Sequence, residues 1–250
     1  MKKIAIIIII FTVFLVIAWQ FNNNPAVILA RLENKTKSKQ GDLVFRINLF
    51  GIIPAGEAVF SRERLESYNG QEVYHLSAMA RPLSIYSAVF KGSAAIDSYV
   101  DKEKLRPLFF KQRVDSPGKE SPQKDISYDI KKNTMTLRGV EREILSNTFD
   151  PLSIMFNLKN MDFSKVENLE MNINTNQKNY LLRGSVKETG LIRDYKSYVV
   201  RAQIKRREND PYHRSNVTIV FIRDSQNIPL LIKVFASGTL ITAKLIDIQE

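Results

Sequence analysis

The chain has 250 residues, enough for one large domain or two small ones. Apolar residues make up 44% and charged residues 25%, which is ordinary globular usage and excludes a disordered chain. The absence of cysteine excludes disulfide scaffolds and thiol nucleophiles, and two histidines leave little material for a metal site. The net charge of +11 favours an anionic partner.

The N-terminus carries an export signal. Lys2 and Lys3 precede a predominantly apolar run, Ile4–Trp19. As a helix this run spans about 24 Å, short of the roughly 30 Å hydrocarbon core of a bilayer. It is either an uncleaved signal-anchor or a signal peptide cleaved after the small residues Val16 and Ala18. Both alternatives place the rest of the chain in the periplasm, and the anchor would hold it at the inner membrane.

The rest of the sequence predicts strands. Alternation of apolar and polar residues, typical of half-buried strands, recurs from Leu43 to the C-terminus. Asn69-Gly70 predicts a two-residue hairpin turn. We expect strands at Leu43–Leu49, Ala58–Leu65, Val73–Ala80, Asp125–Ile130, Thr134–Arg138, Leu169–Asn174, Tyr180–Arg183, Tyr198–Lys205, Val217–Ile222, Leu230–Ala236 and Leu240–Ile248.

So many strands joined by short turns predict an antiparallel meander that curls on itself. The predicted fold class is mainly β: a curved antiparallel sheet or open β-barrel with one or two packed helices, plus the N-terminal hydrophobic helix. The predicted organisation is a signal-anchor or signal peptide over residues 1–20, a tether over 21–41 and a single β-rich domain over 42–250.

Two segments break the strand pattern. Pro82–Lys91 has apolar residues at helical spacing. Asp150-Pro151 opens a second helix, with Asp150 as N-cap and Pro151 at the first helical position. This second helix is apolar around most of its circumference, so we expect it to be buried in the concave face of the sheet or across the barrel mouth.

Several short motifs occur in a characteristic order. They are Gly51-Ile52, Gly56-Glu57-Ala58, Tyr68-Asn69-Gly70, Ser98-Tyr99-Val100-Asp101, Leu105-Arg106-Pro107-Leu108, Asp150-Pro151-Leu152-Ser153, Ile228-Pro229-Leu230, Gly238-Thr239-Leu240 and Ala243-Lys244-Leu245. In this order, from Gly41 to Ile248, they resemble the DUF3108 family of exported bacterial proteins. The resemblance implies a periplasmic β domain with a curved sheet, similar in outline to the half-barrels of lipoprotein carriers, and it implies no catalytic residues.

The sequence offers little material for catalysis. His75 is expected on an outward strand face and His213 in a loop. Asp97 and Asp101 are expected on the same side of one strand at long separation, where a hairpin partner or a tether explains them better than acid–base catalysis. No Gly-x-Ser-x-Gly elbow, phosphate-binding glycine loop or metal-ligand spacing is present. We therefore expect no enzyme activity, catalytic residue, cofactor or metal.

A basic hairpin offers an anion-binding alternative. Its candidate headgroup-binding residues are Arg201, Lys205, Arg206, Arg207 and Arg214. Export excludes nucleic acid and favours anionic lipid headgroups or acidic glycans. The same residues also fit a solvated hairpin tip.

Apolar residues of the concave side offer a second type of site. A curled sheet can enclose a cavity for an amphiphile, although these residues also fit a packed core. The candidates are Phe45, Ile47, Leu76, Phe109, Tyr128, Ile154, Met155, Phe156, Met171 and Ile219. The favoured function is non-enzymatic binding of a lipid or other amphiphile, supporting envelope transport or assembly. The alternatives are a protein-interaction module that docks an envelope complex and an envelope hydrolase.

Overall fold

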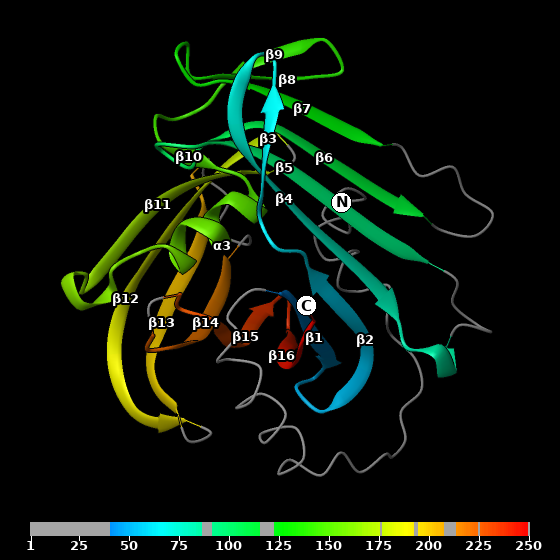
Figure 1. Ribbon diagram of the computed structural model, residues 1–250, viewed down its shortest axis with the longest axis vertical. Helices are drawn as coiled ribbons and strands as arrows, with labels where there is room; N and C mark the ends of the chain where they lie inside the picture. The colour runs from blue at the N-terminus through cyan, green and yellow to red at the C-terminus, as the bar shows by residue number, and fades with distance from the viewer. Residues whose placement is uncertain are drawn as a thin grey trace.

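The protein is built around one large β-sheet that curves about an α-helix (Figure 1). The computed structural model describes residues 41–86, 92–115, 123–175, 177–192, 195–207, 214–224 and 226–249. The sixteen strands are β1 (Asp42–Leu49), β2 (Ile53–Phe60), β3 (Arg64–Tyr68), β4 (Gln71–Pro82), β5 (Ser93–Asp101), β6 (Pro107–Asp115), β7 (Lys124–Asp129), β8 (Thr134–Leu137), β9 (Val140–Glu143), β10 (Thr148–Phe149), β11 (Asn168–Thr175), β12 (Lys178–Ile192), β13 (Tyr195–Arg206), β14 (Arg214–Ile222), β15 (Pro229–Ala236) and β16 (Thr239–Gln249). The α-helix is α3 (Pro151–Lys159), and short 3-10 turns occupy Ser84–Tyr86 and Phe163–Lys165.

The strand order confirms the predicted meander. It runs β10-β11-β12-β13-β14-β15-β16-β1-β2-β4-β5-β6-β7-β8-β9, with β3 paired to β4. Neighbours are antiparallel except for β10 and β11. The first and last strands pair with each other in the middle of the sheet, where Phe45 lies opposite Leu245. That pairing joins the two ends of the described domain into one continuous surface.

The sheet is an open barrel. Its edge strands are β9 and β10, which do not pair with each other. The chain nevertheless passes from one edge to the other between Glu143 and Thr148. Five Cα–Cα steps span at most about 18 Å, so the two edges approach each other at this point. The predicted curved, open architecture is therefore confirmed.

Helix α3 lies inside the curve of the sheet (Figure 1). It begins as predicted, because the Asp150 carboxylate accepts hydrogen bonds from the backbone N–H groups of Leu152 and Ser153, and Pro151 needs no such partner. Ile154 and Leu158 pack against the β11–β14 side of the core. Leu152 and Phe156 pack against β4 and β5. Helix α3 therefore packs against both halves of the curved sheet, β4 and β5 on one side and β11–β14 on the other.

The strand predicted over Ala58–Leu65 is interrupted. β2 ends at Phe60, opposite Ala78, and β3 begins at Arg64, opposite His75. Three residues, 61–63, therefore face two on β4, which is a β-bulge. A bulge bends its strand and redirects side chains. Here it turns residues 61–63 toward the helix.

Two other local predictions need correction. Of the segment predicted as a helix, Pro82–Lys91, the described residues form the end of β4 at Pro82 and a 3-10 turn at Ser84–Tyr86, and residues 87–91 lie outside the described part. The strand predicted to begin at Ala58 starts earlier, because β2 already begins at Ile53. The backbone at Phe50 and Gly51 has positive φ, which closes the chain reversal in fewer residues.

The predicted N-terminal helix and tether lie outside the described residues. Within the described part of the chain, no helix is both long enough and apolar enough to cross a membrane.

Candidate functional site

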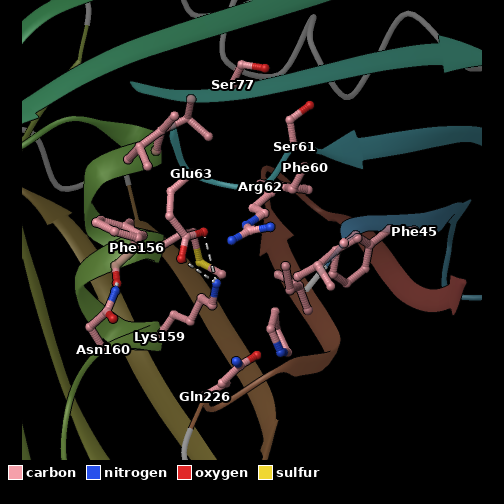
Figure 2. A pocket seen from close by; sticks show the side chains of 17 residues that line it. Phe45, Phe60, Ser61, Arg62, Glu63, Ser77, Phe156, Lys159, Asn160 and Gln226 are labelled. Atoms are coloured by element: carbon pink, nitrogen blue, oxygen red, sulfur yellow. Dashed lines mark hydrogen bonds and ion pairs between the residues drawn. The ribbon is translucent and has the colours of Figure 1, made fainter. Parts of the chain in front are cut away.

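A pocket of about 270 Å³ opens between α3 and the concave face of the sheet (Figure 2). The helix forms one wall, β1 and the start of β15 form another, and the β2–β3 bulge lies at its rim. The lining residues are Gly41, Leu43, Phe45, Phe60, Ser61, Arg62, Glu63, Leu76, Ser77, Leu152, Met155, Phe156, Lys159, Asn160, Gln226, Pro229 and Ile232.

The inner part of the pocket is apolar. Phe45 and Phe60 meet edge to face, with ring centroids 5.4 Å apart. On the helix side, Phe156 packs edge to face against Tyr74 at 5.3 Å. Met155 lies beside Phe156, and its unbranched side chain adapts to contacts of different shape. This region therefore suits an alkyl chain.

The rim of the pocket is charged. The Lys159 ammonium lies 3.1 Å from a carboxylate oxygen of Glu63, and both side chains are about one-third exposed or less. This ion pair links the end of α3 to the bulge (Figure 2). The neighbouring Arg62 is anchored through its backbone N–H, which donates to Asp42 at 2.8 Å.

The Arg62 guanidinium is directed toward the pocket (Figure 2). It forms no ion pair with any acidic residue in the described ranges, whereas the charge of Lys159 is balanced by Glu63. Arg62 is therefore the rim residue whose positive charge is available to a ligand. A guanidinium offers a planar set of donors that matches carboxylate and phosphate groups.

The predicted cavity residues divide into two groups. Phe45, Leu76, Met155 and Phe156 line the pocket. The others pack elsewhere: Ile154, Met171 and Ile219 in the β11–β14 core, Ile47 beside Leu49, Tyr128 beside Met135, and Phe109 against the aromatic rings of Tyr68 and Tyr99. Strand alternation alone does not distinguish Phe45 from Ile47, because both point to the concave face. The prediction for Phe109 is wrong: this residue pairs with Tyr99 and points to the outer face, where the Tyr99 ring stacks on His75.

The rim residues Arg62, Glu63 and Lys159 were not predicted from the sequence. Their signal is the loss of alternation at Ser61-Arg62-Glu63-Arg64, where three charged residues follow each other inside a predicted strand. A bulge interrupts the alternation of a strand, and bulges are over-represented beside active sites.

The predicted anion-binding residues lie away from the pocket. Arg201, Lys205 and Arg207 are exposed on β13 or just after it, and Arg206 is half-buried. The side chain of Arg214 lies outside the described part.

His75 belongs to a separate cluster on the outer face of β3, β4 and β5. Its two ring nitrogens each lie 3.0 Å from a carboxylate oxygen, Nδ1 from Glu66 and Nε2 from Asp97. Its ring stacks on Tyr99 with centroids 4.5 Å apart. His213, the other histidine, lies outside the described residues.

Asp150 is fully buried at the start of α3. Burial raises the pKa of this carboxyl, and hydrogen bonds from Ser98, Ser153 and Leu152 act in the opposite direction. These donors come from β5 and from the first turn of the helix, so the carboxyl connects the two elements. Asp150 is absent from the lining of the pocket, and its role is structural.

No group of three or more metal-ligating side chains occurs among the described residues. The observed features define an open antiparallel β-barrel with a partly apolar pocket under an internal helix.

Comparison with known proteins identifies the family. Residues 44–245 match the model of DUF3108, a protein family of unknown function, and the chain belongs to that family. No curated protein matches the sequence. The fold is similar to a crystal structure described as a β-barrel-like protein of domain of unknown function DUF1849 from Brucella abortus, with a TM-score of 0.57 and 11% sequence identity. The similarity covers 84% of this chain and 98% of that chain, and it concerns the fold.

Proposed function

We propose that this domain binds a lipid or another amphiphile in the cell envelope and supports transport or assembly there. An alkyl chain occupies the pocket under α3, and a polar headgroup lies at the rim beside Arg62. The pocket is the observation that carries the proposal: its lining includes the buried rings of Phe45 and Phe156, whereas Arg62 is exposed and Glu63 and Lys159 are half-buried.

The size of the pocket limits the ligand. Pockets for small molecules typically have volumes of roughly 300–1,000 Å³, and this one has about 270 Å³. It suits a single alkyl chain or part of one. A ligand with several chains would leave the others outside or require α3 to move.

The proposed activity is binding without a reaction. A nucleophile needs a base within hydrogen-bond reach. Both nitrogens of His75 already face carboxylates, so neither is free to activate a nucleophile. The location in the envelope rests on the basic and apolar N-terminal segment, which is typical of export.

A site-resolved experiment tests the proposal. The full chain, reconstituted in phosphatidylcholine vesicles, is exposed to a single-chain fatty acid that carries a photoreactive diazirine, and the cross-linked peptides are mapped by mass spectrometry. We expect cross-links on α3 and on the first half of β1. A readout by peptide separates pocket binding from any lipid contact of the N-terminal segment.

Two matched variants sharpen the result. Met155→Trp fills the pocket from α3, whereas Met79→Trp places the same ring on an outer position that is 54% exposed. Met155→Trp should abolish the cross-links on α3, and Met79→Trp should leave them unchanged. Equal cross-linking in both variants, or cross-links confined to residues 1–40, would refute the pocket as the binding site.

A further inference from the structure

Two neighbouring hairpin turns expose apolar side chains. Phe50 and Ile52, in the β1–β2 turn, are 46% and 80% exposed. Phe235, at the end of β15, is 47% exposed. Exposed apolar residues are ordinary when scattered singly, but a cluster at the tips of adjacent turns marks an interaction surface.

The register places the two turns side by side. Leu49 lies opposite Ile241, and Phe235 lies opposite Leu240. A Cβ atom built on Gly51 would lie 3.1 Å from the Leu240 side chain, so the turns are in contact. Phe50, Ile52 and Phe235 therefore belong to one end of the sheet, which we call the apolar tips.

A basic surface adjoins the apolar tips. Arg201 of β13 lies opposite Thr218, and Thr218 lies opposite Lys233 of β15. Lys205 lies four residues further along β13, opposite Arg214 of β14. The next residue of β14, Ser215, lies opposite Ala236 at the end of β15. Arg201, Lys205 and Lys233 are all exposed, and none forms an ion pair with an acidic residue in the described ranges. We call Arg201, Lys205 and Lys233 the basic face.

The three strands β13, β14 and β15 at this surface contain no acid. Together they include several lysines and arginines. This separation of charge suits an anionic surface rather than a solvated face of mixed charge, where acids and bases alternate.

We propose that the apolar tips and the basic face dock the folded domain on a bilayer that contains anionic lipids. Phe50, Ile52 and Phe235 enter the interface between headgroups and acyl chains, and the basic face binds the anionic headgroups. Aromatic and aliphatic side chains combined with lysine and arginine are the usual composition of surfaces that bind in the plane of a membrane.

This surface is distinct from the pocket. Phe45 lines the pocket, and Phe50 lies five residues further along, beyond the end of β1. At about 3.3 Å per residue the two positions are roughly 17 Å apart. Docking therefore leaves the pocket accessible, and each property can fail without the other.

A tryptophan probe at the tips tests the docking. Trp19 is the single tryptophan of the chain, so Trp19→Phe with Ile52→Trp gives one local reporter in the full-length protein. The protein is reconstituted in vesicles of phosphatidylcholine alone or mixed with phosphatidylglycerol, each with brominated acyl chains that quench tryptophan. We expect a blue shift and quenching only with phosphatidylglycerol, and reversal by high salt.

Control variants separate docking from insertion of the N-terminal segment. Leu65→Trp, in the same Trp19→Phe background, places the reporter on β3 at a position that is 55% exposed, and it should remain unquenched. Lys233→Gln or Arg201→Gln, combined with Ile52→Trp, should each shift the docking equilibrium about fivefold toward the undocked state. Lys104→Gln, on the β5–β6 connection, should not. No quenching at position 52, or equal quenching at positions 52 and 65, would overturn the proposal.

Discussion

The hydroxyl of Ser98 on β5 donates a hydrogen bond to the carboxylate of Asp150 at the N-terminus of α3. Both side chains are completely buried, although 52 residues separate them in the sequence. The same carboxylate accepts hydrogen bonds from the backbone N–H groups of Leu152 and Ser153 in the first turn of the helix. One residue thus caps α3 and fixes it to the sheet, and the wall of the pocket depends on that attachment.

Two substitutions of Asp150 should distinguish the effect of its hydrogen bonds on stability from the effect of its charge. Asp150→Ala removes the N-cap and leaves Ser98 without its partner, so we expect a loss of about 2–4 kcal/mol in the free energy of unfolding. Asp150→Asn keeps an oxygen acceptor for the helix and carries no buried charge, so it should cost less than half as much at neutral pH. Urea denaturation of the three proteins measures both values, and equal losses would contradict this role.

The difference in stability between the wild type and Asp150→Asn should depend on pH. Burial raises the pKa of Asp150 above its ordinary value of 3.8, so the folded protein retains this proton at a higher pH than the unfolded chain. The stabilisation by this group is fully present below pH 3.8 and is lost as the pH rises through the folded pKa. The stability of the wild type relative to Asp150→Asn should therefore fall across that window. A difference that increases with pH would show that the folded pKa is lowered instead.

Tyr128 should tolerate loss of its hydroxyl. This group is buried and has no hydrogen-bond partner among the described residues. Burial, followed by the nearby Asp150, raises the pKa of Tyr128 well above its usual range, so the phenol stays neutral. Since a buried unsatisfied group is unfavourable, Tyr128→Phe should increase stability by up to about 1 kcal/mol. A measurable loss in thermal unfolding would mean that the hydroxyl has a bound partner.

The Glu63–Lys159 pair should couple the bulge to the helix. A double-mutant cycle with Glu63→Gln and Lys159→Met should give an interaction energy of about 1 kcal/mol, which decreases at high salt because both groups are partly exposed. The control pair Lys102 and Glu72, with side chains 47% and 69% exposed, should give a smaller value. Additive effects at Glu63 and Lys159 would show that the pair does not hold the rim in place.

Replacing Gly184 even by alanine, which adds only a Cβ atom, should reduce the stability of the protein. A Cβ atom at this position would lie 2.3 Å from the Arg201 carbonyl oxygen and 2.6 Å from the Ala202 Cβ. Gly184→Ala therefore forces β12 and β13 apart, with an expected loss of about 1–3 kcal/mol. Gly190→Ala on the same strand has open space around the new atom and should be nearly neutral. Similar stabilities for the two variants would contradict the close packing of these strands.

Local features could be predicted from the sequence because they depend on neighbouring residues. The alternation in Leu169–Asn174 predicted β11, Asn69-Gly70 predicted the β3–β4 turn, and Asp150-Pro151 predicted the start of α3. Contacts between distant residues could not be predicted in this way. The pairing of β1 with β16 is one such contact, and the bulge that brings Glu63 to Lys159 is another.

The volume of the pocket could not be predicted from the sequence either. Phe45 and Ile47 both point to the concave side and have the same alternation, yet Phe45 lines the pocket and Ile47 packs beside Leu49. The difference arises from the position of α3, which leaves space next to one residue and not next to the other. A residue pattern specifies a face of a strand, whereas unfilled volume depends on every side chain around it.

The most direct test of amphiphile binding uses the methionine methyl groups as reporters. Met155 lines the pocket, Met135 is buried in a separate core cluster and Met79 is exposed outside. The full chain, labelled with ¹³C-methyl methionine and reconstituted in phosphatidylcholine nanodiscs, is titrated with a single-chain fatty acid. We predict that the Met155 resonance shifts and saturates while Met135 and Met79 stay in place, and that contacts between the alkyl chain and the Met155 methyl appear. An unchanged Met155 resonance at saturating fatty acid would contradict the proposed binding site.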